Sequence, residues 1–305
     1  AYALFGAAAT LGIAISLFAG AAVIGVLAGV GDIVLPFGTL ALWKAAFLVA
    51  SVPGLVVAVL LLFVREPERR ERLTRSGGGF LPFLRSRSSA IAVAFAVYGL
   101  INFAGYGVLA WAATAYVRLY GMTIAQGGIT LGVILLIGTI AGAPLGGYLS
   151  DRWVRKGRRG GGLLVPVMSG SVGALAFAGW WLTHSYVASI AFGGLAFAMQ
   201  IASTATAPSV IAALAPNEFR GQLAALYLLL TGLFGIAAGP SAIALVTDQL
   251  FGRPEALREA LILVPVPAVL AAALLAWTCG RRFMPNAQER PAIPQPLVPS
   301  IAGAG

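Results

Sequence analysis

The chain has 305 residues, of which 59% are hydrophobic and 10% charged, and it carries a net charge of +10. Soluble domains carry about 25% charged residues, so this composition excludes an ordinary soluble protein and indicates a membrane protein. The lone cysteine, Cys279, excludes an internal disulfide and a cysteine-based metal site. We expect no metal and no cofactor, and we expect the basic residues to meet a lipid bilayer rather than nucleic acid.

Eight apolar stretches follow one another along the chain. A membrane helix needs about 20 apolar residues, whereas a barrel strand is about ten residues of alternating polarity. Because these stretches are long and continuous, the sequence predicts an all-α integral membrane protein. In chain order, we expect membrane spans at residues 2–30, 42–64, 89–117, 123–149, 162–182, 186–214, 223–246 and 257–280.

Basic residues predict the orientation of these spans. Sixteen of the 20 follow the second, fourth, sixth or eighth span, and four lie on the other side. By the positive-inside rule the richer side faces the cytoplasm, so both termini are expected there. Residues 283–305 are rich in Pro and small residues, which is typical of a disordered tail.

The second and eighth spans repeat one another, LWKAAFLVASVPGLVVAVLLLFV from residue 42 and ALREALILVPVPAVLAAALLAWT from residue 256. A shift of 214 residues aligns Lys44 with Arg258 at the entrance of each span and Pro53 with Pro267 inside it. The shift covers six spans, which is half of a twelve-span protein built from two repeats. We therefore expect the chain to hold the fifth to twelfth spans of such a protein, without the first four.

The charged stretch between the fourth and fifth spans reads GGYLSDRWVRKGRR, residues 146–159. It resembles the signature loop of the major facilitator superfamily, Gly-x-Leu-(Ser/Ala)-Asp-Arg-x-Gly-Arg-(Arg/Lys), which follows the second span of that family and, as a weaker copy, the eighth. Val154 stands where the family usually has Gly. Further stretches resemble family motifs at the entrance and exit of the sixth span, between the tenth and eleventh spans, and within the eleventh: LWKAAF, REPERR, APNEFRGQ and GIAAGP.

The resemblance implies the fold and domain organisation of this family. Residues 1–64 would be the last two helices of the N-terminal half, 65–88 the central cytoplasmic loop, 89–282 the six-helix C-terminal half and 283–305 the tail. It also implies a secondary active transporter rather than an enzyme, located in the inner membrane of a bacterium.

The signature stretch has a physical role as a conformational latch. Asp151 can face the positive end of a neighbouring helix and pair with Arg152 or Arg155, while Gly147 permits close helix approach. Lys156 continues the basic run toward anionic headgroups. The resemblance implies docking of this loop near residues 1–5 and release as the two halves rock. The alternative is a topological anchor, which would not need Asp151.

Polar residues at membrane depth are candidates for a substrate cavity, because such groups are costly in hydrocarbon. They form three helical stripes, to which one aromatic wall residue is added: Tyr98, Asn102 and Tyr106; Gln200, Ser203 and Thr204; Tyr227 and Thr231; and Trp111. The alternative for each is an interhelical hydrogen bond. We expect the Gly-x-x-x-Gly-Pro stretch at Gly235, Gly239 and Pro240 to serve helix packing.

No Asp, Glu, Lys, Arg or His lies near the middle of a predicted span. A proton- or sodium-coupled carrier would therefore place its coupling residue in the missing spans. The uncharged, aromatic candidates favour an amphipathic or neutral organic solute. Within the family, the stretches LWKAAFLVASVPGL and WAATAYVRLYGMTIAQGG most resemble bacterial spinster-like members, whose cargo tends to be amphipathic lipids or drugs, which agrees with such a solute. Anion or sugar-acid symporters are the next most similar members. The alternative from another class is a non-transporting, truncated or sensor-like derivative of a carrier.

Overall fold

The computed structural model describes residues 12–13, 15–23, 25–26, 33–35, 38–64, 79–156 and 161–283. The described residues before 27 are helical. A short hairpin then joins β1 to β2, and the rest of the described chain is helical. The elements are β1 (Ile33–Leu35), β2 (Gly38–Leu40), α2 (Leu42–Leu61), α3 (Phe80–Ser86), α4 (Ser88–Tyr120), α5 (Ile124–Arg155), η1 (Gly161–Leu163), α6 (Leu164–Leu182), α7 (Tyr186–Leu214), α8 (Arg220–Leu230), η2 (Thr231–Ala238), α9 (Gly239–Leu245), η3 (Val246–Leu250), η4 (Pro254–Ala256), α10 (Leu257–Leu263) and α11 (Pro265–Phe283).

The all-α membrane fold is confirmed. Among the described residues, six helical segments are long and apolar enough to cross a membrane, and they correspond to the last six predicted spans. The predicted second span is α2, a helix of 20 residues. The two-stranded hairpin lies in the connection before it, where Val34 pairs with Thr39.

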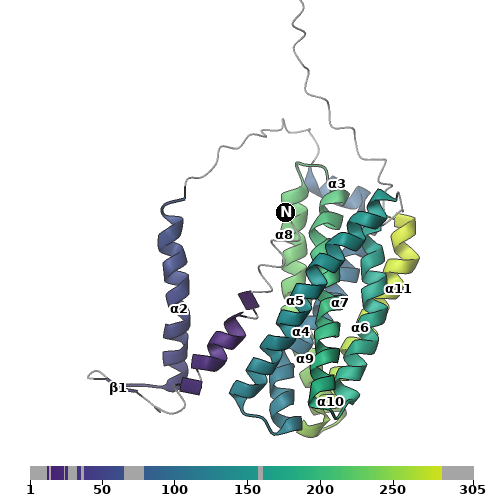
Figure 1. Ribbon diagram of the computed structural model, residues 1–305. Helices are drawn as coiled ribbons and strands as arrows, with labels where there is room; N and C mark the ends of the chain where they lie inside the picture. The colour runs from purple at the N-terminus through teal and green to yellow at the C-terminus, as the bar shows by residue number, and fades with distance from the viewer. Residues whose placement is uncertain are drawn as a thin grey trace, which may run out of the picture.

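The last six spans form one bundle of antiparallel neighbours (Figure 1). α4 and α5 are joined by a tight turn at Gly121, whose φ of 65° suits a residue without a side chain. α5 then begins with a capping box: Gln126 N donates to Thr123 Oγ1 at 3.2 Å, and Thr123 N donates to Gln126 Oε1 at 2.9 Å. This turn fixes two helices of 33 and 32 residues side by side.

α5 and α7 approach each other through glycine. A Cβ on Gly142 would overlap the carbonyl oxygen of Ala198, and one on Gly146 would overlap that of Ala202. In lipid, small residues at a helix interface allow the dispersion contacts that hold helices together. The four-residue spacing of these glycines therefore determines which face of α5 meets α7.

The predicted seventh span is one helical segment of changing geometry. It runs from Arg220 to Leu250 as α8, the π-helical η2, α9 and the π-helical η3. Pro240 lies next to η2, and its ring would clash with a carbonyl one α-turn earlier. A wider π turn at that point moves the carbonyl away from the ring.

α2 stands apart from the bundle (Figure 1). Every residue from Phe47 to Val64 on it and just beyond it is exposed. The helix formed by the described residues before 27 does reach the bundle, because a Cβ on Gly132 of α5 would lie 3.1 Å from the Phe18 ring. The predicted N-terminal pair of helices is thus represented by one helix that contacts the bundle and by α2, which is buried at Ala45 near its start and exposed from Phe47 onward.

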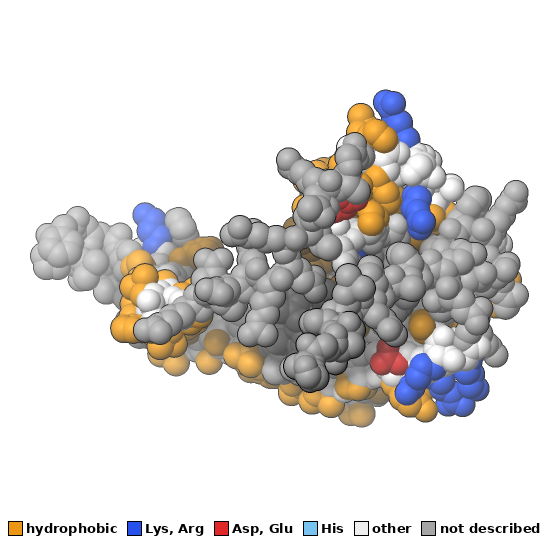
Figure 2. Space-filling model, turned by 90° about the horizontal axis from the view of Figure 1, so that it is seen from above, with side chains coloured by type: hydrophobic (Ala, Val, Ile, Leu, Met, Phe, Trp, Pro, Cys, Tyr) orange, Lys and Arg blue, Asp and Glu red, His pale blue; other side chains and the backbone are white. Residues whose placement is uncertain are grey.

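Charged side chains collect at the two ends of the bundle. One end carries Arg85, Arg87, Arg152, Arg155, Lys156 and Arg220, and the opposite end carries Arg118, Arg253 and Arg258. Figure 2 looks down on the first end, where Lys and Arg side chains (blue) stand at several points beside hydrophobic ones (orange). The charge asymmetry follows the predicted two sides, while the assignment of one side to the cytoplasm stays a prediction.

One predicted boundary is wrong. The fourth span was expected to end at Leu149, but α5 continues to Arg155, because basic residues stabilise the C-terminal turn of a helix. The eighth span has the predicted bounds, residues 257–280, and contains one break: α10 ends at Leu263 and α11 begins at Pro265, which has no N–H to continue the helical hydrogen bonds. In the repeat, α2 is unbroken although Pro53 lies inside it.

Candidate functional site

Four side chains join α4, α7 and α8 at membrane depth, and we call them the α4 polar cluster: Tyr98, Asn102, Thr206 and Tyr227. The Tyr98 hydroxyl lies 2.8 Å from Thr206 Oγ1, and Asn102 Nδ2 donates to Tyr227 Oη at 3.3 Å. The rings of Tyr98 and Tyr227 meet edge to face, with centroids 6.3 Å apart. Residues 125 positions apart in the chain are therefore brought into one polar group.

The direction of these hydrogen bonds follows from counting protons. Thr206 Oγ1 donates to the Ser203 carbonyl at 2.7 Å, so its only proton is used and the Tyr98 hydroxyl must donate to it. Asn102 Nδ2 also donates to the Tyr98 carbonyl at 2.8 Å. The cluster is consequently fully uncharged, with the Asn102 to Tyr227 bond as its longest link.

The adjoining part of α4 faces η2 and α9 at close range. A Cβ on Gly235 would lie 3.0 Å from the Tyr106 ring, and one on Gly239 would overlap the Phe103 carbonyl oxygen. Trp111 Nε1 donates to the Pro240 carbonyl at 3.0 Å. The predicted packing residues thus lie on the α4 interface, and the predicted aromatic wall residue holds the turn beside them. Thr231 begins η2, one turn after Tyr227.

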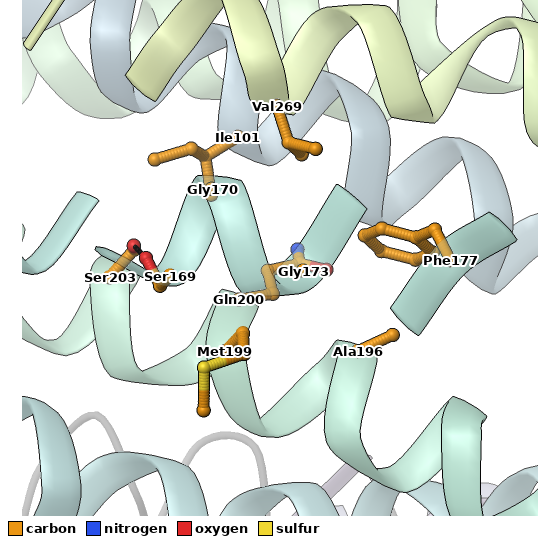
Figure 3. A pocket seen from close by; sticks show the side chains of 10 residues that line it. All are labelled: Ile101, Ser169, Gly170, Gly173, Phe177, Ala196, Met199, Gln200, Ser203 and Val269. Carbon is orange, nitrogen blue, oxygen red and sulfur yellow. Dashed lines mark hydrogen bonds between the residues drawn. The ribbon is translucent and has the colours of Figure 1, made fainter. Parts of the chain in front are cut away.

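The predicted stripe on α7 is divided by the structure. Gln200 and Ser203 line a small interior pocket between α4, α6, α7 and α11, where Ser203 is hydrogen-bonded to Ser169 (Figure 3). Thr204 does not line it and donates to the Ile201 carbonyl at 3.3 Å on its own helix. The pocket's accessible volume is about 10 Å³, which is room for about one water molecule and not for an organic solute.

Gln200 fills a place that only glycine leaves open. A Cβ on Gly105 of α4 would overlap the Gln200 amide. Within the described chain, Gln200 Oε1 is buried without a hydrogen-bond partner. This amide is therefore wedged between α4 and α7 rather than projecting into a wide cavity.

Sequence reasoning missed a second polar and aromatic group at the other end of α4. We call it the external aromatic cluster because the positive-inside rule predicts that this end faces outward: Tyr116, Trp180, Trp181, Tyr186 and Ser189. Trp180 Nε1 donates to Tyr116 Oη at 2.8 Å, and Tyr116 Oη lies 2.9 Å from Ser189 Oγ. Since Ser189 donates its proton to the Tyr186 carbonyl at 2.8 Å, Tyr116 donates to Ser189. The signal that could have found it is the density of aromatic residues at these three helix ends.

The signature residues lie in the last turns of α5, not in a loop. Arg152 donates to the Tyr148 hydroxyl at 3.3 Å, and Arg155 Nε donates to the Asp151 carbonyl at 3.3 Å. Across residues 79–156 and 161–283, the Asp151 carboxylate makes no ion pair, so the expected pairing with Arg152 or Arg155 is not seen. The reason is that all of these side chains are exposed and hydrated. Gly147 and Lys156 occupy the same helix end, and the expected docking segment, residues 1–5, lies outside the described residues.

Ionisable groups stay at the helix ends throughout the described spans. The only ion pair among the described residues joins Arg253 and Glu259 at 3.6 Å, beyond the end of η3. No group of three or more His, Cys, Asp or Glu in the described chain is placed to hold a metal ion. A membrane bundle with an uncharged, hydrogen-bonded interior and charged ends defines a multi-pass membrane protein.

Residues 1–240 match the Major Facilitator Superfamily, and the chain belongs to that family. It is 25% identical over 253 residues to an MFS-type efflux pump of Mycolicibacterium smegmatis, covering 79% of this chain and 57% of that protein. It is 27% identical over 217 residues to the uncharacterized transporter YybO of Bacillus subtilis, covering 63% of this chain and 49% of that protein. The chain thus spans about half the length of these relatives, which are transporters and not enzymes.

The fold is similar to that of a bacterial homologue of the human lysosomal transporter Spinster. The TM-score is 0.53 with its inward-facing, unoccupied form, at 18% identity, covering 80% of this chain and 58% of that one. With the inward-facing, occupied form the TM-score is also 0.53, at 16% identity, covering 82% and 58%. The resemblance to spinster-like members of the family is therefore confirmed at the level of the fold.

Proposed function

We propose that this protein is part of a secondary active transporter that moves a small organic or amphipathic solute by alternating access. The observation that carries the proposal is the α4 polar cluster, an uncharged set of phenol, amide and hydroxyl groups at membrane depth. Such groups are costly in hydrocarbon, and polar side chains of three helices that meet in one cluster favour a transport pathway over isolated interhelical hydrogen bonds. Family membership supports the same conclusion.

The chemistry of the cluster favours an amphipathic or neutral solute over a small dianion. The rings of Tyr98 and Tyr227 offer apolar surface, and Asn102 offers polar hydrogen-bonding groups. Basic side chains in the described spans stand only near helix ends, so no cation is placed to neutralise a dianion beside the cluster. A coupling proton or sodium ion would need a titratable partner outside these spans.

The proposal includes four further spans that complete the carrier. Three observations support it: the repeat of the second span as the eighth, the exposed apolar surface of α2 from Val49 to Leu61, and the 57% and 49% coverage of the two transporters above. The first experiment is to sequence the coding DNA upstream of Ala1. Four more apolar spans in frame, with a first signature loop, would support the carrier. A stop codon followed by a start near Ala1 would contradict it and favour a sensor-like protein.

Transport is tested in proteoliposomes that contain the full-length protein, with ethidium, a fluorescent lysophospholipid and radiolabelled gluconate as probes. We expect accumulation of an amphipathic probe and not of gluconate. Asn102→Leu should abolish it, whereas Thr114→Ala, on the same helix but outside the cluster, should not. Accumulation of gluconate alone would overturn the solute class, and equal rates in Asn102→Leu would overturn the site.

We further propose that the end of α5 is the conformational latch, formed by Gly147, Asp151, Arg152, Arg155 and Lys156. Its exposed carboxylate is available to dock on a helix start of the other half. Asp151→Asn should slow transport severely, and Asp248→Asn, an exposed carboxylate in η3 at the opposite end, serves as its matched control. A wild-type rate in Asp151→Asn would reduce the stretch to a topological anchor.

A further inference from the structure

η2 is the longest π-helical segment in the described spans, with 8 residues, and it lies between two contacts with α4. Before it, Tyr227 accepts a hydrogen bond from Asn102, and after it the Pro240 carbonyl accepts one from Trp111. Each π turn holds about one residue more than an α turn. Conversion of such a turn to α geometry would rotate α8 relative to α9 by about 100° per residue of register.

We propose that η2 is a register switch, in which loss of the π turn swings Tyr227 away from Asn102 while Trp111 keeps hold of Pro240. The proposal rests on the transport function above, because it assigns a moving part to the same site. In this switch, the Tyr227 hydroxyl contacts Asn102 in one state and is turned away from it in the other.

The two hydrogen bonds at the ends of η2 differ in length, and the longer one is at the end that the proposal expects to move. Trp111 Nε1 to the Pro240 carbonyl is 3.0 Å, and Asn102 Nδ2 to Tyr227 Oη is 3.3 Å. A backbone carbonyl held by an indole cannot rotate away without moving the helix, whereas a phenol on a side chain can. The longer bond is therefore the one that breaks.

The interface between η2 and α4 is shaped for sliding rather than interlocking. Gly235 and Gly239 present backbone to α4, where a Cβ on the second would overlap the Phe103 carbonyl. Gly232 meets nothing within 4 Å. On the η2 side of this interface the two glycines place no side chain in a groove of α4, so rotation has to clear the Tyr106 ring over Gly235 and the backbone contact at Gly239.

The rest of this span offers little resistance. In the most apolar 18-residue stretch of this span, 17% of the residues are buried, whereas the share is between 44% and 61% in the other five spans. Leu228, Leu229 and Leu233 are each more than half exposed. Since lipid chains can repack around a rotating apolar face, the cost of the rotation lies in the contacts with α4 and in the hydrogen bonds at the start of α8, where Arg220 Nε donates to the Ala212 and Ala215 carbonyls at 3.1 and 3.3 Å.

The test is a distance measurement between two spin labels across η2, in full-length protein in lipid nanodiscs without substrate. The labels are placed at the exposed positions Leu228 and Leu245, in a background with Cys279→Ser. We expect two distance populations. Deleting the exposed residue Ile236 removes the extra residue and should leave one population, the one that keeps the flanking helices in their present orientation. Pro240→Ala removes the cause of the π turn and should enrich the other.

A control pair at Leu175 and Leu182 lies on uninterrupted α6 and should give one distance in every variant. One unchanged distribution for the Leu228 and Leu245 pair in all variants would overturn the switch. Two populations without solute transport would overturn the transport proposal and leave the switch standing. Transport at the wild-type rate after deletion of Ile236 would overturn the role of the switch.

Discussion

α4 carries two tyrosine-centred groups that differ in how completely they are enclosed. In the external aromatic cluster, the rings of Trp180 and Trp181 stack with centroids 4.7 Å apart, and Trp180 and Tyr116 are 0% exposed. Its hydrogen bonds measure 2.8 to 2.9 Å. In the α4 polar cluster the link to Tyr227 is 3.3 Å and only partly buried. Tyrosine therefore makes short, enclosed hydrogen bonds in the external aromatic cluster and accepts a longer, partly exposed one in the α4 polar cluster.

The difference shows which part of the bundle is fixed. The external aromatic cluster joins α4, α6 and α7, while the α4 polar cluster joins α4 and α7 to the less buried α8. Mutations should therefore cost stability in the first and function in the second. Four substitutions test this division.

Trp180→Ala should have the largest effect on stability. It removes a fully buried ring and leaves a void among aromatic neighbours, which costs about 3 kcal/mol or more in comparable cores. Thermal unfolding of the detergent-solubilised protein measures the loss. Trp277→Ala, at a residue that is 50% exposed, is the matched control and should change the midpoint much less. An equal fall in the unfolding midpoint of both variants would contradict the stabilising role of the external aromatic cluster.

Gly239→Ala should come next, because its Cβ would overlap the Phe103 carbonyl and separate α9 from α4. Overpacking of this kind costs about 1–3 kcal/mol. Gly232→Ala meets nothing within 4 Å and should be neutral or slightly stabilising. The same unfolding assay compares the two variants, and a neutral Gly239→Ala would show that α9 does not need to approach α4.

Tyr116→Phe tests the hydrogen bonds of the external cluster alone. The substitution leaves Trp180 Nε1 as a buried donor without its acceptor, which costs about 1–3 kcal/mol. Transport should continue at a rate close to wild type wherever the protein is folded. A folded variant with severely reduced transport would place Tyr116 in the pathway and erase the contrast between the two clusters.

Tyr227→Phe should have the smallest effect on stability, about 0.6 kcal/mol for one interhelical hydrogen bond. Its effect on transport should nevertheless be large, because the phenol is the group that Asn102 holds. Tyr186→Phe loses one phenolic hydrogen bond to Thr130 outside the cavity and is the control. The proposal fails if both variants transport their solute equally well.

Hydropathy was sufficient to predict the last six helical spans, because the bilayer imposes one length and one polarity on each of them. Their internal geometry was not predictable in the same way. Pro240 indicates a kink, but the sequence of one helix does not show that the wide turns extend over eight residues or that Gly235 in them faces α4. Residues at the water boundary, such as Arg155, gave no hydropathic sign that α5 continues to them.

The candidate site was predictable in composition and less so in arrangement. Helical spacing placed Tyr98 and Asn102 on one face of α4, and both lie in the α4 polar cluster, while their role in a substrate cavity stays a prediction. It could not show that Thr204 bonds back to its own helix while Gln200 occupies the space over Gly105. Partner identity depends on which helices are neighbours, and that information is absent from a single helix. The external aromatic cluster was missed for the same reason.

The hairpin of α4 and α5 has a mechanical consequence. Two helices of 33 and 32 residues are each about 48 Å long, which exceeds the roughly 30 Å of hydrocarbon. The three-residue turn around Gly121 joins the two helices, so a change of the angle at this turn displaces their far ends the most. A tilt of about 10° there would displace the far end, which carries the signature residues, by about 8 Å. A small change of angle at one end of the hairpin would therefore be a large displacement at the other.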